Sequence, residues 1–476
     1  MASFSWNVKV KSLFMNTHND SQQLKVWKGF MILSLVLLFV SGTLFAQKVW
    51  TLEDCIQQAL ENNIRIKQSK LDVSSGEVNM RESKFNLLPS LNASASHSYG
   101  WGRSIDLATY QYVDQQTQQS YFNISSDVTL FSGFQKMNTM KQRRAEYLAA
   151  RYNSDKVSND IALAVAGYYL QILFSQELVS NSRRQLEVTA QQVERTRKLV
   201  DAGTLAKGSL LEIQAQLANE EVNVVQAQNQ LNLAYLDLLQ LLELSSDNEI
   251  SIDVPALKLP DTPSLLPVQN IYSTALGIMP EIKSAEYYTE SSRNALAVAK
   301  GSRSPSLGLQ GGFGTNYSDQ ILDITSGDVK PFDDQVRDNK STTLAIRLNI
   351  PIFNGYQINS YINRSRINLE NANYNLDLAR NTLRKGIESA YSDALAAYAS
   401  YTARQKSLSS LRESFKYTEE KFNVGMVNAI DYNVAKNQLS RAESDLLSGK
   451  YDYIFKLKIL DFYLGRTISL NDLTEN

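Results

Sequence analysis

The sequence contains the same series of motifs twice. Leu-Pro-Ser-Leu at residues 88–91 is matched by Ser-Pro-Ser-Leu at residues 304–307, an offset of 216 residues (305 − 89). Phe-Ser-Gly-Phe-Gln at 131–135 is matched by Phe-Asn-Gly-Tyr-Gln at 353–357, an offset of 222 residues (353 − 131). A duplicated chain is expected to fold as two similar units. The segment between the two motifs must tolerate a six-residue difference in length, so it contains a loop.

The first segment has the features of an export signal. Lys25 and Lys28 precede an apolar run at residues 30–40, which ends in Ser-Gly-Thr-Leu-Phe-Ala at 41–46. Because this run is short for a membrane span of about 20 residues, we interpret residues 1–46 as a cleaved signal peptide. A retained anchor and a buried helix are the alternatives. The stretch ahead of Lys25 is long for a signal, so Met15 is an alternative start.

The duplication predicts the domain organisation of the remaining chain. We expect the first repeat at residues 47–244, the second repeat at 268–465, and a C-terminal tail at 466–476. Residues 245–267 contain four of the nine prolines, a composition typical of a linker. A short strand candidate, Ile250–Val254, lies within this linker.

Very long helices are predicted in the segments without proline. All nine prolines lie outside residues 90–254 and 352–476, and a proline inside a helix costs about 3 kcal/mol. Within these segments apolar residues recur at three- and four-residue steps, as in amphipathic helices. We therefore predict two helical hairpins, at residues 134–243 and 356–464. At 1.5 Å per residue, the first arm of each hairpin is roughly 100 Å long.

Each hairpin is predicted to turn at a glycine. Gly203 and Gly425 follow the long helical patterns, and glycine past a helix end adopts the left-handed conformation at little cost. A further helical stretch precedes each strand pair, at residues 52–86 and 268–303. A proline ends each of these stretches and admits the strand.

Between the paired motifs the hydrophobic period changes from helical to two. Alternating apolar and small or polar residues predict four strands, at residues 89–103, 119–131, 305–315 and 341–353. Segments of about ten residues with one apolar face are typical of a membrane β-barrel wall. Trp101 and the tyrosines near the strand ends fit an aromatic girdle, and the connecting loops at 104–119 and 316–341 are polar. The alternative is an ordinary half-buried sheet.

Four strands cannot close a barrel, for which about eight are needed. An open sheet edge in lipid leaves backbone groups unpaired at several kcal/mol each. The chain is therefore expected to assemble with copies of itself through contacts that close into a ring. The residues alone do not determine the number of copies.

With these features established, the chain resembles the TolC family of outer-membrane efflux proteins. The resemblance covers residues 50–466. It rests on Leu-Pro-Ser-Leu before the strands, Leu-Phe-Ser-Gly and Ile-Phe-Asn-Gly after them, and Phe-Asn-Val-Gly-Met-Val-Asn-Ala-Ile-Asp at 422–431. The order and double occurrence of these motifs make it specific.

This resemblance implies an α+β membrane protein: a homotrimer with a 12-stranded β-barrel in outer-membrane lipid, continued by a 12-helix α-barrel tunnel in the periplasm. It implies a Gram-negative-type bacterium and passive export, driven by an inner-membrane transporter through a periplasmic adaptor. The adaptor would dock on the helical tips, which are Gly203, Thr204, Leu205, Gly425, Met426 and Val427.

The resemblance also places a candidate periplasmic constriction, with departures from the family pattern. Asp431 matches the acidic position of the family, but Val427 replaces an arginine found in some members. Ser209 stands where the first repeat can carry the equivalent aspartate, and Glu212 lies one turn later. We expect either an apolar constriction using Phe422 or a ring of Asp431 carboxylates, which would repel each other. The alternative role of Asp431 is helix capping or dipole compensation.

The sequence argues against an enzyme and against a generic nucleic-acid binder. It has 48 basic and 49 acidic residues, and it contains no phosphate-binding loop and no Cys/His cluster with metal spacing. We predict no cofactor and no metal. Cys55, the one cysteine, cannot form an internal disulfide and is predicted to be buried. The competing function is a secreted helical-hairpin scaffold that binds partner proteins. The exported substrate cannot be inferred.

Overall fold

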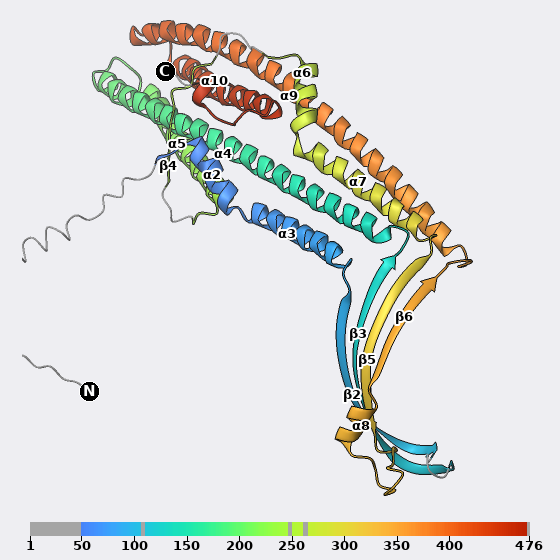
Figure 1. Cartoon of the computed structure of the whole chain (residues 1–476). Helices are drawn as coiled ribbons and strands as arrows, with labels where there is room; N and C mark the ends of the chain where they lie inside the picture. The colour runs from blue at the N-terminus through green and yellow to red at the C-terminus, as the bar shows by residue number, and fades with distance from the viewer. Residues whose placement is uncertain (1–48, 106–109, 246–249, 260–264, 474–476) are drawn as a thin grey trace, which may run out of the picture. The chain divides into compact units, whose positions relative to one another are not determined.

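The computed structural model describes residues 49–105, 110–245, 250–259 and 265–473 (Figure 1). The predicted signal peptide, residues 1–46, lies outside the described residues. The chain forms two compact units. The described part of the smaller unit is a parallel pair of short strands, β1 (Val49–Trp50) and β4 (Ser251–Ile252). β4 falls on the strand candidate of the linker. All other described elements belong to the larger unit, which begins at Thr51.

The helices before the strands follow the first offset. α2 (Leu52–Asn62) and α3 (Ile64–Phe85) recur 216 residues later as α6 (Val268–Ile278) and α7 (Pro280–Gly301). Each predicted helical stretch is divided into two helices, because the backbone leaves the helical conformation at one residue. Asn63 has ψ 130° and its side chain accepts a hydrogen bond from the Arg65 N–H, which caps α3. In the second repeat Met279 is extended and Pro280 starts α7.

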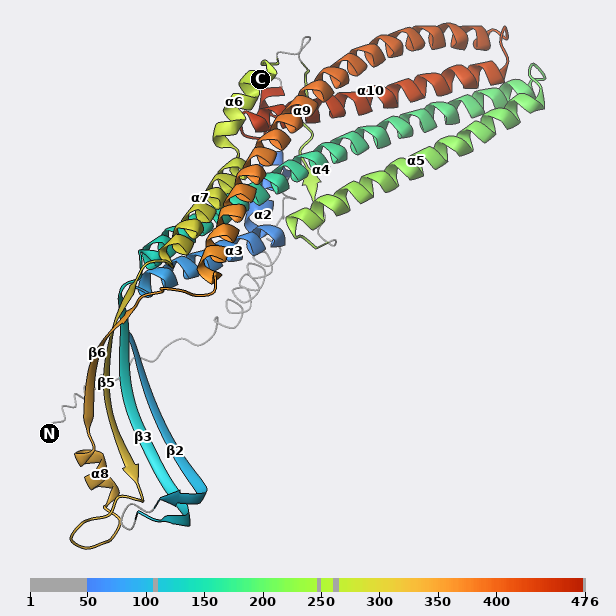
Figure 2. The ribbon, with the colours of Figure 1, turned by 90° about the vertical axis from the view of Figure 1, so that its right-hand side faces the viewer.

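The long helices follow the second offset, as predicted. α4 (Gln135–Asp201) and α9 (Gln357–Asn423) have 67 residues each, and α5 (Lys207–Leu242) and α10 (Ala429–Tyr463) return beside them (Figure 2). At 1.5 Å per residue, α4 extends roughly 100 Å from the end of the sheet to its tip. The apolar core lies between these helices.

The four-stranded sheet is antiparallel in the order β2-β3-β5-β6, so β2 and β6 are its edges. The strands are β2 (Ser90–Ile105), β3 (Tyr112–Phe131), β5 (Ser306–Ser318) and β6 (Ser341–Asn349).

Three strand boundaries and one loop of this region were predicted wrongly. β5 ends at Ser318 rather than at residue 315, because its pairing with β3 continues to that residue. β3 begins at Tyr112 rather than at residue 119, because backbone pairing to β2 continues through glutamine-rich sequence without an apolar period. β6 ends at Asn349 rather than at residue 353, because Pro351 has no N–H to donate to a ladder. The polar loop at 316–341 contains a helix, α8 (Phe332–Asp338).

The register confirms that the sheet has one apolar face and one polar face. Residues opposite each other in a ladder point to the same face. The apolar pairs are Ala95↔Phe122, Ile124↔Phe313 and Leu309↔Ile346, and the polar pairs between them are Ser94↔Asn123, Ser125↔Gly312 and Gly308↔Arg347. Phe332 of α8 packs on Phe122 and Tyr317 at one end of the apolar face. The rest of this face remains uncovered: Leu344 is 76 % exposed and Ile346 is 71 % exposed.

The helices next to the sheet repeat its order. α3 packs on α4, α4 packs on α7, and α7 packs on α9. Since β2 follows α3 and β6 precedes α9, the edge strands are joined to the edge helices. The layer of helices therefore has the same two open sides as the sheet.

Two smaller expectations can also be compared with the fold. Cys55 is fully buried, as predicted, and has no disulfide. The segment at 466–476 was expected to be a separate tail, but its described part packs into the larger unit. Ile468, Leu470 and Leu473 are buried, and the Leu473 carbonyl accepts a hydrogen bond from the Lys258 N–H (2.8 Å).

Candidate functional site

The first tip is a tight turn that ends α4 and starts α5. Gly203 has φ +73°, a left-handed conformation that glycine adopts without strain. Its N–H donates to the Val200 carbonyl (2.9 Å), while the Thr204 N–H (2.9 Å) and hydroxyl (2.8 Å) both donate to the Leu199 carbonyl. These bonds satisfy carbonyls that the end of the helix leaves free.

The second tip has the same turn with different side chains. Gly425 has φ +77°, its N–H donates to the Phe422 carbonyl (3.0 Å), and the Met426 N–H donates to the Lys421 carbonyl (2.8 Å). A Cβ atom at Gly203 or Gly425 would meet nothing within 4 Å. Backbone conformation, and not space, therefore requires glycine at both tips.

The predicted tip residues are accessible, and a small apolar cluster joins the two hairpins behind them. Thr204 and Met426 are exposed, while Leu205 and Val427 are half-buried. The cluster contains Val193, Ile213 and Ala429, with Leu210, Leu217 and Phe422 packed against it. The two tips therefore belong to one packed end of the helical bundle.

The four residues of the candidate constriction lie near this end, but the single chain does not bring them together. Ser209 and Glu212 are in the first turns of α5, and Asp431 is in the first turn of α10. Glu212 and Asp431 are exposed. Phe422 is half-buried and stacks on Tyr432, with ring centroids 4.7 Å apart. No hydrogen bond joins any two of the four within the described part of the chain.

Helix capping at this end is performed by Asn428 and not by Asp431. The Asn428 side chain accepts a hydrogen bond from the Asp431 N–H (2.8 Å), as an N-cap residue does. The Asp431 carboxylate is thus left to face solvent at the positive end of the α10 dipole.

Sequence reasoning missed a buried polar seam between the two hairpins. Lys436 of α10 is 2 % exposed, and its ammonium donates to the Thr189 hydroxyl of α4. Burial lowers the pKa of Lys436, while the negative charges of Glu220 and Glu419 act to raise it. The sequence does contain a sign of this burial, because Lys436 falls on the apolar stripe of α10, between Tyr432 and Leu439.

The seam continues through side chains of α5 and α10. The Gln216 amide nitrogen donates to the Glu220 carboxylate (2.8 Å) and to the Asn437 side-chain oxygen (2.9 Å). Further along, the Glu177 carboxylate of α4 accepts hydrogen bonds from Lys450 and from the Tyr451 hydroxyl. Burial, together with this carboxylate, raises the pKa of Tyr451. The hydrogen bonds of this seam hold the two hairpins in one position relative to each other, in addition to apolar packing.

No group of three or more His, Cys, Asp or Glu side chains in the described ranges could hold a metal ion. His97 lies on the apolar face of β2. Its ring nitrogen Nδ1 is 2.8 Å from the Ser120 hydroxyl oxygen, and its ring packs edge-to-face with the Tyr99 ring, with centroids 4.8 Å apart. Tyr99 in turn stacks on Trp101. With these neighbours, His97 fits a place in the predicted aromatic girdle better than the role of a catalytic base.

Comparisons with known proteins agree with this arrangement. The profile of the family described as outer membrane efflux protein matches residues 55–243 and 271–466. The outer membrane efflux protein BepC of Brucella suis biovar 1 is 23 % identical over 433 residues, which are 90 % of this chain and 89 % of BepC. Outer membrane protein TolC of Escherichia coli K12 is 23 % identical over 446 residues, 92 % of this chain and 87 % of TolC.

The fold is also similar to solved structures. The outer membrane protein VceC of Vibrio cholerae superposes with a TM-score of 0.73 at 16 % identity, over 88 % of this chain and 96 % of VceC. At this identity the similarity concerns the fold alone.

Proposed function

The chain belongs to the outer membrane efflux protein family, and from this premise we propose that three copies form the passive outer-membrane duct of a tripartite efflux or type I secretion system. The chain is an outer-membrane efflux or secretion channel component. The observation that carries the finer proposal is the uncovered apolar face of a sheet with two open edges.

The sheet supports a barrel wall shared between copies. Its apolar face suits contact with lipid hydrocarbon, and its polar face suits a water-filled lumen. Within lipid, the backbone groups at the edges of β2 and β6 must find partners. Pairing β6 of one copy with β2 of the next satisfies the edge of β6 and the adjoining part of β2, and three copies of four strands give a 12-stranded barrel.

The edge helices support the same closure in the tunnel. On α3 a stripe of exposed apolar residues recurs every seven positions, at Ile64, Leu71, Val78 and Phe85. On α9, Ile367 and Tyr374 are exposed and also seven residues apart. Apolar stripes with heptad spacing pack against partner helices. We propose that α3 of one copy packs against α9 of the next copy. This contact would continue the ring of strands as a ring of helices.

The tips are proposed to receive the periplasmic adaptor, and the end behind them to form the constriction. The turns at Gly203–Leu205 and Gly425–Val427 offer backbone and the exposed side chains of Thr204 and Met426 at the end of the long helices. Asp431, exposed at the start of α10, would form a ring of three carboxylates in the trimer. The packing of Phe422 on Tyr432 favours this acidic ring over an apolar one that uses Phe422.

Single-channel recording tests the constriction. Asp431→Ala should lower the conductance for cations and weaken the response to divalent cations, because it removes three carboxylates that attract cations and whose mutual repulsion favours an open ring. Ser209→Ala, at the equivalent position of the first repeat, is the matched control and should change neither. Unaltered conductance and cation response in Asp431→Ala would leave this carboxylate only a structural role.

Cysteine accessibility tests the duct itself. In a Cys55→Ala background, single cysteines at positions 343–346 would be reacted with a water-soluble and a lipid-soluble maleimide in outer membranes. We expect positions 344 and 346 to react with the lipid-soluble reagent and positions 343 and 345 with the water-soluble reagent. A monodisperse monomer without detergent, with all four positions equally wet, would favour the secreted scaffold instead.

A further inference from the structure

The edge strand β6 is shorter than the strand beside it. The β5–β6 ladder runs from Ser306↔Asn349 to Gly314↔Ser341 and stops there. β5 continues to Ser318, which is still paired on its other side with Gln119 of β3. The last residues of β5 therefore have an edge that β6 does not cover.

Residues 330–339, which contain α8 and are called the α8 segment below, cover this edge in place of a strand. The Gln335 amide accepts a hydrogen bond from the Ser318 N–H (3.0 Å) and donates one to the Ser318 carbonyl (2.8 Å). Nearby, Asn339 donates to the Asn316 carbonyl (2.9 Å), and the Thr315 hydroxyl donates to the Val336 carbonyl (2.7 Å). Gln335 is fully buried. The α8 segment thus occupies the position that a longer β6 would take.

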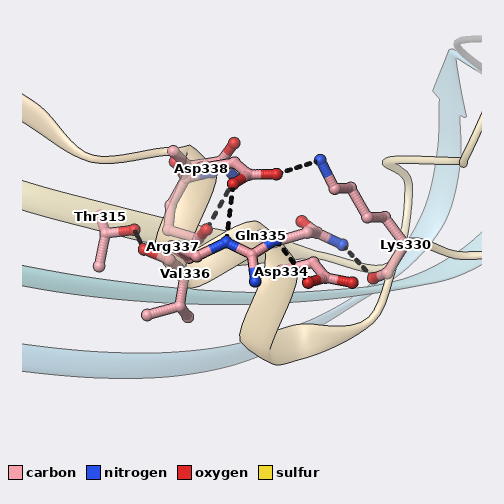
Figure 3. Close-up of polar contacts among 9 residues, drawn as sticks. Thr315, Lys330, Asp334, Gln335, Val336, Arg337 and Asp338 are labelled. Atoms are coloured by element: carbon pink, nitrogen blue, oxygen red, sulfur yellow. Dashed lines mark hydrogen bonds and ion pairs between the residues drawn. The ribbon is translucent and has the colours of Figure 1, made fainter.

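The segment is also held firmly within itself (Figure 3). The Lys330 ammonium and the Asp338 carboxylate are 2.7 Å apart, and Arg337 pairs with Asp334 at the same distance. The Gln335 amide donates a further hydrogen bond to the Lys330 carbonyl (2.7 Å). With each of these groups partnered, α8 is a fixed surface on this side of the sheet.

The opposite edge of the sheet has the complementary length. β2 has 16 residues and β6 has 9, and both meet the helices at the same end of the sheet, β2 at Ser90 and β6 at Asn349. When β6 of one copy pairs with β2 of the next in register from the helix end, it covers residues 90–98 of β2, and the far part of β2, residues 99–105, extends beyond it. That part must lie beside the α8 segment of the neighbouring copy.

We propose that α8 of one copy docks on β2 residues 99–103 of the next copy and forms the part of the subunit interface that lies far from the helices. The inference rests on the proposed closure of copies into one barrel. Asp333 and Arg337 lie two residues before and after the buried Gln335, on the helix face turned away from β5. Asp333 is exposed and makes no ion pair with any residue that the structure describes. Arg103 of β2 is exposed beside the Tyr112 ring. Opposite charges thus meet across this interface, Asp333 with Arg103 of the next copy.

Disulfide trapping in the full-length protein tests this contact. In the Cys55→Ala background, Asp333→Cys would be combined with Arg103→Cys, and the matched control would combine Asp333→Cys with Ala93→Cys on the same face of β2 nearer the helices. A disulfide needs Cα atoms about 4.4–6.8 Å apart. After mild oxidation, denaturing gels without reductant should show covalent dimers and trimers for the Arg103 pair and monomers for the Ala93 pair.

The outcomes separate this inference from the proposed function. Trimers that form without the Asp333–Arg103 cross-link, or that cross-link through position 93 instead, would overturn the α8 interface and leave the duct intact. A Cys55→Ala parent that never forms trimers would overturn both. Independently, Asp333→Arg should lower the temperature at which trimers dissociate, and Arg103→Asp in the same chain should restore it. No recovery in the double variant counts against the pair.

Discussion

The two repeats differ little along their helices and much at the ends of those helices. α4 and α9 have the same length and the same offset, whereas the strand connection contains a helix only in the second repeat among the described residues. The N-cap residue of α5 in the first repeat, Ala206, has no side chain that caps the helix, whereas the N-cap residue of α10 in the second repeat, Asn428, caps it with its side chain. Duplication thus supplied a common scaffold, and the ends of the helices carry the differences.

The largest expected difference concerns the glycines that join strand to long helix. Gly133 and Gly355 both have positive φ, but a Cβ at Gly133 would lie 2.5 Å from the Gly301 carbonyl oxygen, while one at Gly355 would meet nothing within 4 Å. Gly355→Ala should cost about 1 kcal/mol of unfolding free energy through backbone strain. Gly133→Ala should cost about 3–5 kcal/mol, because overpacking adds to the strain.

Denaturant unfolding of the purified protein in detergent measures both costs. Gly203→Ala, with positive φ and open space, is the control and should behave like Gly355→Ala. Equal losses at positions 133 and 355 would show that the close approach to Gly301 has no energetic weight.

This comparison also shows what the sequence could and could not predict. Helix pairs were predicted to within a few residues because a duplicated apolar stripe and the tip glycines mark them twice. The two faces of the sheet followed from alternation. The start of β3 and the α8 segment were missed because their order depends on backbone pairing and on the Gln335 side chain, which no periodicity marks.

The candidate site was predictable to the same extent. The positions of the two tip turns could be predicted from Gly203 and Gly425, since a positive φ at a helix end is a local property of the chain. The burial of Lys436 depends on how α4 packs against α10, a contact between repeats that a single stripe does not show. The constriction residues were placed by resemblance, and the single chain does not bring them together.

A second, smaller difference concerns Lys436 and its repeat counterpart Gln214 (436 − 222). Gln214 is half-buried and carries no charge. Lys436→Ala should cost about 1–3 kcal/mol, because the Thr189 hydroxyl loses its donor and the buried Glu220 loses a nearby positive charge. Gln214→Ala should cost clearly less.

The pH dependence provides the control. Since burial lowers the pKa of Lys436 from 10.5, the unfolded chain binds this proton more tightly than the folded one. The contribution of Lys436 to stability should therefore increase as pH rises from the lowered pKa toward 10.5. Lys436→Met should lose this rise. A rise that persists in Lys436→Met would assign it to other groups.

The smallest expected effect comes from removing the side-chain cap of α10, which would make the start of this helix like the uncapped start of α5. Asn428→Ala removes the cap on the Asp431 N–H and should cost about 1 kcal/mol locally. Amide hydrogen exchange in the first turn of α10 should become about five-fold faster. Ala206→Asn should slow exchange in the first turn of α5 by a similar factor. Asn428→Ser, which keeps a capping oxygen, should leave α10 unchanged. If exchange at Asp431 were as slow in Asn428→Ala as in the parent, the apolar cluster behind the tips and not the cap would be what orders α10, and the two repeats would differ at their tips only in the side chains they present.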